Sequence, residues 1–324
     1  VIGVGSMGQN QARIYSEISN LVAVVDTNEA QGRDVADRFG VDWYQDYRDI
    51  LDKVDAVSVS VPTSFHREVA EVLSSAGVHL LIEKPLAGNS LDANAIVQTC
   101  KKARVKLAVG HVERHNPIVT HAKKAIENGE WGEIITQSSR RVSSFPSRIR
   151  DVGVLFDLTL HDIDISNYLA GSDINSVYAV GGRMRAEHED YVNIILEHKS
   201  GVISICETNW LTPMKIRKLG ITTSSHYVEL DYQSQSIKLF NSRYVDVNEK
   251  NLYSSGLEFE SKDLQIEKKE PLLLEITDFL SAIRDDKDPL VTGKDGYEVV
   301  RISEVALASL NQKKKLHFDF GVKG

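Results

Sequence analysis

A lysine follows a strand of buried character in the stretch LLIEKPLAG, residues 80–88. Apolar residues run into Glu83 and Lys84, and Pro85 then ends the strand, because proline has no main-chain N–H to donate. In a parallel sheet, ligands bind outside the carboxyl ends of the strands. The Lys84 ammonium is therefore a candidate for holding a substrate hydroxyl, and a lysine that reaches into solvent is the alternative.

A carboxylate and a histidine form a second candidate pair, in the stretch GVLFDLTLHDIDISNYLAG, residues 153–171. On a helix, Asp157, His161 and Asp164 share one face, because residues three or four apart are neighbours on the helix surface. A carboxylate one turn before a histidine can orient the ring and raise its basicity. Asp157 and His161 therefore predict an acid–base pair supported by Asp164, and an ion pair on a solvated helix is the alternative.

A glycine-rich turn opens the chain, in VIGVGSMGQNQARIYSEI, where an apolar strand end leads into a helical pattern. Gly3 permits the tight turn, Gly5 lets the main chain approach a pyrophosphate, and Gly8 lets helix and strand pack closely. The helix N-terminus then faces the phosphates. The dinucleotide-binding residues predicted in this turn are Gly3, Gly5, Ser6, Met7 and Gly8.

An acidic residue ends the second apolar strand, LVAVVDTN, at the spacing expected for such a site. Asp26 can accept hydrogen bonds from the ribose hydroxyls of the adenosine, and its charge repels a 2′-phosphate. Thr27 and Asn28 follow, so no arginine is present there to hold that phosphate. The sequence thus favours NAD over NADP.

Strands and helices continue to alternate as far as KLAVG, which predicts a parallel sheet with helices on both faces. Several residues at the carboxyl ends of these strands are further candidates for cofactor contacts. These are Pro62, Thr63, His66, Glu83 and Lys84. His66 either touches the cofactor or caps the helix that follows it.

The pattern changes near Arg114, where period-2 segments and turn signals replace the alternation. YVNIILEHKSGVISICETNW predicts a hairpin, and the last two helices either cover a face of the second sheet or return to the first domain. We predict an α/β fold with an N-terminal Rossmann doubly wound parallel sheet at 1–113. A C-terminal α+β domain with an open, mainly antiparallel sheet is predicted at 114–324. Since an open sheet leaves one face uncovered, we expect a homodimer or homotetramer.

Composition narrows the function classes. The chain has 324 residues and a formal net charge of −8, which argues against nucleic acid or an anionic membrane surface as a partner. Neither a signal peptide nor a membrane span is evident. Cys100 and Cys206 are far apart and no cluster has zinc spacing, so we expect no metal and a cytoplasmic location. Because the chain begins at Val1, we expect that a few residues of the first strand precede it.

The motifs GVGSMG, VVD, VPTSFH and EKPLA, in this order, resemble the glucose–fructose oxidoreductase, inositol dehydrogenase and MocA family. The resemblance implies that Lys84 is catalytic and that its bond to Pro85 is cis. It also implies a D-x-x-x-H pair at Asp157 and His161, with Asp164 supporting it. For oxidation of a secondary alcohol by NAD, we assign His161 as the general base, because an ordinary lysine with a pKa of about 10.4 is a poor base. Lys84 then stabilises the developing alkoxide, although the family resemblance is compatible with either base.

Two stretches, VGHVERHNP and SFPSRIRDVGVLFDLTLHDID, look like the branch that oxidises C3 of UDP-N-acetylglucosamine and related nucleotide sugars. Arg148 and Arg150, with two more arginines at 140 and 141, suit a diphosphate. The remaining candidates for substrate contacts are Glu113, Arg114 and Asn116. His115 stands where this branch more often has an aromatic residue. A dehydrogenase of inositol or a free sugar, and a non-catalytic NAD(P)-sensing regulator, are the alternatives.

Overall fold

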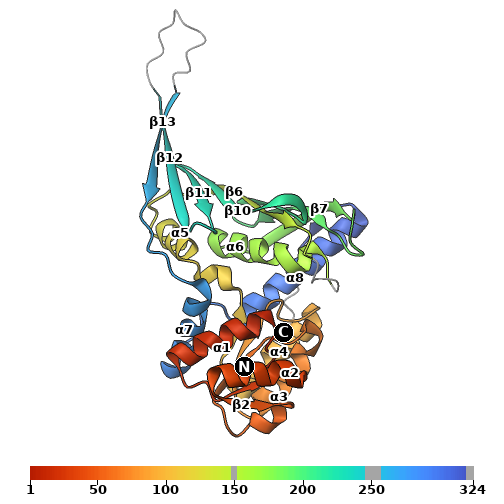
Figure 1. Ribbon diagram of the computed structural model, residues 1–324. Coiled ribbons are helices and arrows are strands. Elements are labelled where there is room, and N and C mark those ends of the chain that lie inside the picture. The colour runs from red at the N-terminus through yellow and green to blue at the C-terminus, as the bar shows by residue number, and fades with distance from the viewer. Residues whose placement is uncertain (147–151, 245–256, 319–324) are drawn as a thin grey trace, which may run out of the picture. The chain divides into compact units, whose positions relative to one another are not determined.

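The computed structural model describes residues 1–146, 152–244 and 257–318 (Figure 1). The chain divides into two compact units. Unit 1 consists of Val1–His115 and Lys269–Glu304, and unit 2 consists of Asn116–Lys268 and Val305–Gly324. Unit 1 is therefore discontinuous in sequence. The sequence left open whether the last two helices cover the second sheet or return to the first domain, and the first of these two helices belongs to unit 1.

Unit 1 contains a parallel sheet. Its strands are β1 (Ala23–Val25), β2 (Asp42–Tyr44), β3 (Ala56–Val59), β4 (His79–Glu83) and β5 (Leu107–Gly110). Strands β1 and β2 pair in parallel, as do β3, β4 and β5. Ile2 forms parallel bridges to both Val25 and Val59, so the first segment of the chain joins the two groups of strands. Counted along the chain with this segment first, the strand order is 3-2-1-4-5-6, which confirms the predicted Rossmann sheet.

Helices cover both faces of this sheet. They are α1 (Ser6–Ile18), α2 (Glu29–Phe39), α3 (His66–Ser75), α4 (Ser90–Ala103), α7 (Pro271–Arg284) and residues 293–304 of α8 (Gly293–Gln312), with short 3-10 turns η1 (Tyr47–Ile50), η2 (Thr63–Phe65) and η3 (Val112–His115). Apolar residues of α3 and α4 belong to one buried core, and those of α1, α2 and α7 belong to a second core. The alternation of strand and helix in the sequence thus produces the doubly wound architecture.

Unit 2 is built on a larger sheet of nine strands. They are β6 (Ile134–Ser144), β7 (Ile174–Gly182), β8 (Tyr191–His198), β9 (Ile203–Asn209), β10 (Leu211–Thr223), β11 (Tyr227–Asp231), β12 (Ser236–Tyr244), β13 (Leu257–Leu264) and β14 (Leu316–His317). The order is β13-β12-β11-β10-β6-β9-β8-β7-β14. Only the β6–β9 pair is parallel among these described strands, which confirms the mainly antiparallel sheet. The predicted hairpin is β8–β9.

Helices pack on one face of this sheet, as Figure 1 shows for α5 (Pro117–Glu127) and α6 (Leu160–Ala170). Their apolar residues share a core with β10, β11 and β12. The alternation of side chains leaves Ile195, Ile203 and Ile205 between 38% and 41% exposed, whereas Ile194 and Leu196 are buried. No helix in the described ranges is long and apolar enough to cross a membrane.

Candidate functional site

The glycine turn of unit 1 is shaped by contacts that leave no room for side chains at two of its glycines. Gly3 has a φ of +81°, and a Cβ atom there would lie 2.7 Å from the Ser60 carbonyl oxygen. A Cβ atom at Gly8 would lie 1.9 Å from the Gly3 carbonyl oxygen, so Gly8 is needed for α1 to pack on the turn. At Gly5, by contrast, a Cβ atom would meet no heavy atom within 4 Å. Gly5 therefore faces open space, where a bound molecule can approach the main chain.

Helix α1 begins directly after Gly5, and no side chain of the described residues caps its first N–H groups. Ser6 and Met7 form the exposed start of the helix. Unsatisfied N–H groups at a helix start attract anions, since the helix dipole adds to their partial positive charge. The open space at Gly5 and these N–H groups together fit the pyrophosphate of a dinucleotide.

Asp26 follows β1 and ties the glycine turn to the next helix. Its Oδ2 accepts a hydrogen bond of 2.9 Å from the Val4 main-chain N–H, and its Oδ1 accepts one of 2.9 Å from Asn28. The Asn28 side chain in turn caps α2 by accepting from Gln31. The carboxylate is thus held at the carboxyl edge of the sheet with part of its surface exposed, where it can accept hydrogen bonds from a ribose.

The segment after β3 contains Pro62 and Thr63 at the start of η2, with Pro62 exposed and Thr63 partly buried. His66 is only 1% exposed, and its ring contacts three main-chain carbonyl oxygens. Nδ1 lies 3.1 Å from that of Pro85 and 3.3 Å from that of Leu86, while Nε2 lies 3.0 Å from that of Val61. Burial lowers the pKa of His66 despite these contacts. The ring therefore joins the loops after β3 and β4, a role that neither sequence alternative included.

Lys84 lies at the end of β4, partly exposed, and its peptide bond to Pro85 is cis, as the family resemblance implied. The preceding residue, Glu83, accepts a hydrogen bond of 2.8 Å from Nε2 of Gln11, a fully buried side chain of α1. Burial raises the pKa of Glu83 to about 7, although the Lys84 ammonium acts to lower it. Gln11 was not identified from the sequence, because its contact to Glu83 exists only once α1 packs on the sheet.

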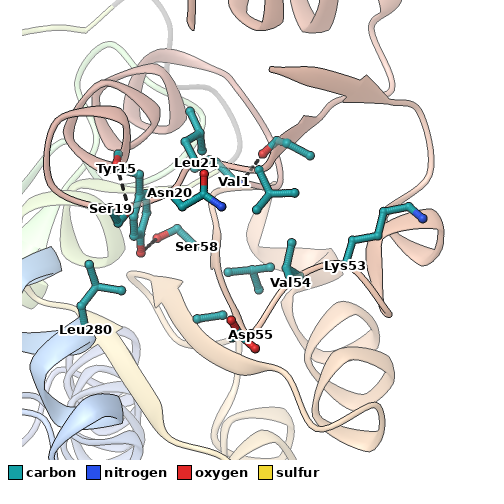
Figure 2. Close-up of a pocket in the computed structure, with 14 residues that line it drawn as sticks. Val1, Tyr15, Ser19, Asn20, Leu21, Lys53, Val54, Asp55, Ser58 and Leu280 are labelled. Atoms are coloured by element: carbon teal, nitrogen blue, oxygen red, sulfur yellow. Dashed lines mark hydrogen bonds between the residues drawn. The ribbon is translucent and has the colours of Figure 1, made fainter. Parts of the chain in front are cut away.

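A separate hollow of about 290 Å³ lies in unit 1, shown in Figure 2. Val1, Tyr15, Ser58 and residues 19–23 and 53–57 form most of its lining. Residues 19–23 and 53–57 lie at the amino ends of β1 and β3, whereas the glycine turn, Asp26 and Lys84 follow the carboxyl ends of strands. The hollow is therefore distinct from the predicted cofactor site, which we define by the carboxyl edge.

In unit 2, the predicted acid–histidine helix begins with a π-helical turn, η4 (Leu155–Thr159), that continues into α6. Asp157 belongs to the π turn and His161 to the α-helix, and both are partly buried, while Asp164 is only 1% exposed. In a π turn the main-chain hydrogen bonds span five residues rather than four. The simple i,i+4 geometry expected from the sequence therefore does not describe the Asp157–His161 step.

A buried ion pair anchors α6 to the sheet. Nε of Arg141 lies 3.1 Å from both carboxylate oxygens of Asp162, and both side chains are almost completely buried. Arg140, the neighbour on β6, pairs with Glu207 at 3.1 Å on the surface. These two arginines thus have carboxylate partners within unit 2, and a diphosphate role for them is not needed to explain their presence. Arg148 and Arg150 lie outside the described residues.

The remaining candidates, Glu113, Arg114 and Asn116, are all buried. Arg114 forms an ion pair of 3.0 Å with Asp295 of α8, within unit 1. Burial acts to raise the pKa of Asp295, but the Arg114 charge and hydrogen bonds from Thr292 outweigh it and the pKa is lowered. Asn116 caps α5, because its side chain accepts from the Ile118 N–H. Arg114 and Asn116 thus have structural roles that the sequence did not reveal.

Two family models match the chain. The oxidoreductase family with an NAD-binding Rossmann fold, GFO/IDH/MocA, matches residues 1–111, and the C-terminal domain of the same family matches residues 119–225. Across the described ranges, no three His, Cys, Asp or Glu side chains gather as a metal ion would require.

Similar proteins cover almost the whole chain. UDP-N-acetylglucosamine 3-dehydrogenase of Acidithiobacillus ferrooxidans is 29% identical over 300 residues, which are 93% of each chain. A solved structure of that enzyme superposes with a TM-score of 0.87 at 27% identity, covering 96% of both chains. Myo-inositol 2-dehydrogenase of Thermotoga maritima is 25% identical over an alignment of 335 positions, gaps included, that covers 98% of each chain.

Proposed function

Because this chain belongs to the GFO/IDH/MocA family of NAD-dependent oxidoreductases, we propose that it oxidises the C3 hydroxyl of a nucleotide sugar such as UDP-N-acetylglucosamine to the 3-keto sugar. The observation that carries this proposal is the position of Lys84 at the end of β4. The same carboxyl edge of the sheet carries the glycine turn and Asp26. Similarity over 93% of the chain to a UDP-N-acetylglucosamine 3-dehydrogenase supports the choice of substrate class.

The chemistry divides between the cofactor and the side chains. NAD supplies the hydride acceptor. The glycine turn and the start of α1 would hold its pyrophosphate. The Asp26 carboxylate would accept hydrogen bonds from the hydroxyl groups of the adenosine ribose. We assign His161 as the base that takes the hydroxyl proton, with Asp157 orienting its ring and Asp164 supporting the pair. The Lys84 ammonium binds the same hydroxyl and stabilises the alkoxide as it forms.

Arg148 and Arg150 are the proposed diphosphate ligands, and Glu113 is a further candidate for the sugar. A charged hydrogen bond contributes about 1.5–3 kcal/mol, so Arg148→Ala or Arg150→Ala should raise KM for UDP-N-acetylglucosamine roughly ten- to a hundredfold. A contact made equally in the ground and transition states leaves kcat unchanged. An unchanged KM in both variants would remove the arginines from the site.

An inositol or free-sugar dehydrogenase is the second candidate, favoured by the similarity to a myo-inositol 2-dehydrogenase over 98% of the chain. The experiment that separates the two is a thermal-shift screen of the NAD-loaded protein. UDP and UDP-sugars should raise Tm if the substrate is a nucleotide sugar, because both carry the diphosphate. A rise with inositol or glucose alone would favour the polyol reading.

The open face of the nine-stranded sheet supports an oligomer. Ile195 and Ile205 are direct partners in the β8–β9 register, and Ile203 lies on the same face. Exposed isoleucines in one patch are typical of a surface that binds another protein copy. We propose a homodimer or homotetramer that buries this patch, and Ile205→Asp should shift the oligomer toward monomer in light scattering.

The state of the two cysteines is consistent with a protein kept in a reducing compartment. Cys100 lies in the core of unit 1 and Cys206 in the core of unit 2, and both are free thiols. Proteins kept in the cytoplasm retain such thiols in reduced form. A cytoplasmic location is therefore part of the proposal, and cell fractionation tests it.

A further inference from the structure

Helix α7 contains one carboxyl group in the face that it packs against the Rossmann sheet. Leu272, Ile276 and Phe279 form an apolar stripe in the core with α1, and Glu275 lies on the same face, 2% exposed. Within the described part of the chain, neither carboxylate oxygen of Glu275 has a hydrogen-bond donor. An ionised carboxylate is strongly disfavoured in such surroundings, whereas a protonated one is neutral. The geometry thus favours a neutral Glu275.

The carboxylate of the second residue, Glu83, accepts hydrogen bonds, unlike that of Glu275 within the described ranges. Ser60 donates from its Oγ to Oε1 of Gln11 at 2.6 Å, which fixes the Gln11 amide so that its Nε2 faces Glu83 at 2.8 Å. The main-chain N–H of Lys84 also hydrogen bonds to the Glu83 carboxylate. These donors stabilise the ionised form of Glu83, so a negative charge at this place lies on Glu83 rather than on Glu275.

Titratable residues lie on α7 itself and on the elements α1 and η3 that pack on it. Burial first, then the charges of Glu83 and Asp278, raise the pKa of Glu275 well above its ordinary value. Tyr15 of α1 has its own pKa raised mainly by burial, with a smaller contribution from Glu275. The turn η3 packs on α7 as well and carries Glu113, Arg114 and His115, of which Arg114 is paired with Asp295. The two charges that raise the pKa of Glu275, those of Glu83 and Asp278, are thus negative, while the positive Arg114 is paired with Asp295.

We propose that Glu83 and Glu275 form one buried carboxyl pair in which Glu275 keeps its proton, while Glu83 gives its proton to solvent when oxidised NAD binds. The proposal rests on the cofactor site at the carboxyl edge of the sheet. Two carboxyl groups close together do not both ionise readily, so the pair carries at most one negative charge near neutrality. Glu83 ends β4 directly before Lys84, at the carboxyl edge of the sheet, where the positively charged nicotinamide form would favour that charge and the neutral reduced form would not.

The consequence is a link between pH and the oxidation state of the bound cofactor. Below about pH 7, where free Glu83 is mostly protonated, affinity for NAD⁺ should rise with pH by up to about tenfold per unit. Affinity for NADH should stay nearly constant over the same range. The ratio of the two dissociation constants therefore changes with pH, and it levels off once Glu83 is ionised in the free protein.

Isothermal titration calorimetry measures directly the number of protons that are released when the cofactor binds. At about pH 6, NAD⁺ binding in two buffers of different ionisation enthalpy should release a fraction of a proton, and NADH binding should not. Glu83→Gln should lose the release, and its affinity for NAD⁺ should no longer change with pH over this range. Glu17→Gln, an exposed carboxyl on α1, is the matched control and should behave like the unaltered protein. Binding of NAD⁺ without proton release overturns this proposal alone, whereas failure to bind either form of the cofactor overturns the proposed function with it.

A second measurement reports on Glu275 itself. The infrared C=O stretch of a protonated carboxylic acid should persist in the unaltered protein at about pH 9, where Glu83 is ionised, and disappear in Glu275→Gln, which keeps the shape of the side chain. Glu275→Leu provides a second variant of similar size should the amide disturb packing, and it too should lack the band. A band that is absent from the unaltered protein, or that survives both substitutions, shows that Glu275 does not hold the proton and overturns the pair.

Discussion

The Gln11 amide donates a hydrogen bond of 2.8 Å to Glu83, the residue directly before Lys84. Gln11 is fully buried, so Gln11→Leu leaves the Glu83 carboxyl without its side-chain donor. Loss of a donor to a buried charged group costs about 1–3 kcal/mol of unfolding free energy. Urea unfolding should show a decrease of that size. Gln98→Leu, on the exposed surface of α4, is the control and should change stability by less than about 0.5 kcal/mol.

The contrast between Gly5 and Gly8 gives a second prediction. Gly5→Ala has room in the free protein, so Tm should be nearly unchanged while NAD affinity falls at least about tenfold, about 1.4 kcal/mol, because the methyl group occupies the approach of the pyrophosphate. Gly8→Ala places a Cβ atom 1.9 Å from a carbonyl oxygen and should lower Tm strongly. Calorimetric melting and NAD titration of both variants test this. Equal NAD affinity in Gly5→Ala and the unaltered protein would remove Gly5 from the cofactor site.

The buried Arg141–Asp162 pair makes a third prediction. Asp162→Ala removes the carboxylate that pairs with the buried Arg141 guanidinium and should cost about 3–5 kcal/mol of unfolding free energy. The neighbouring exposed pair supplies a matched control, because Arg140 directly precedes Arg141 on β6 and pairs with Glu207 of β9. Glu207→Ala should cost at most about 1 kcal/mol. Similar decreases in unfolding free energy in both variants would mean that burial of the Arg141–Asp162 pair does not determine its contribution to stability.

His115 predicts a pH dependence of stability. Burial, with a smaller contribution from the Arg114 charge, lowers the pKa of His115 to about 4 from 6.5. The folded protein therefore binds fewer protons than the unfolded chain between these values, and stability falls as pH decreases from about 6.5 toward 4. The loss from this residue is up to about 3 kcal/mol. His115→Phe should remove that part of the acid sensitivity in denaturant titrations at several pH values, and an unaltered pH profile would contradict the burial of a neutral ring.

Elements with a local signal in the sequence could be predicted from it. The glycine turn, the strand before Asp26 and the strand before Lys84 each combine a periodic apolar pattern with a residue that ends it. Strand β2, with three residues and no alternating burial, and β14, with two, carry too little pattern to be predicted. The sequence pattern also does not distinguish a π turn from an α-helix, so the step from Asp157 to His161 was predicted as ordinary helix.

Contacts between residues far apart in the chain leave no local signal in the sequence. Arg141 pairs with Asp162 because β6 and α6 pack together, and Gln11 meets Glu83 because α1 lies on the sheet. Glu275 stands at the helical spacing of the buried apolar residues of α7. The sequence does not show that the fold brings this carboxyl group near Glu83. Such partners depend on the topology, which a single sequence does not encode in any local pattern.

Reduction of NAD by the purified protein tests the central proposal most directly. With UDP-N-acetylglucosamine, the absorbance of reduced nicotinamide should rise, and inositol and glucose should give a much weaker signal. Lys84→Ala and His161→Ala should each lower kcat by about 10²-fold or more with little change in NAD affinity, whereas Lys53→Ala, at the amino edge of the sheet, should not. NADH formation with inositol but not with the nucleotide sugar, or full turnover in the Lys84 variant, would contradict the account.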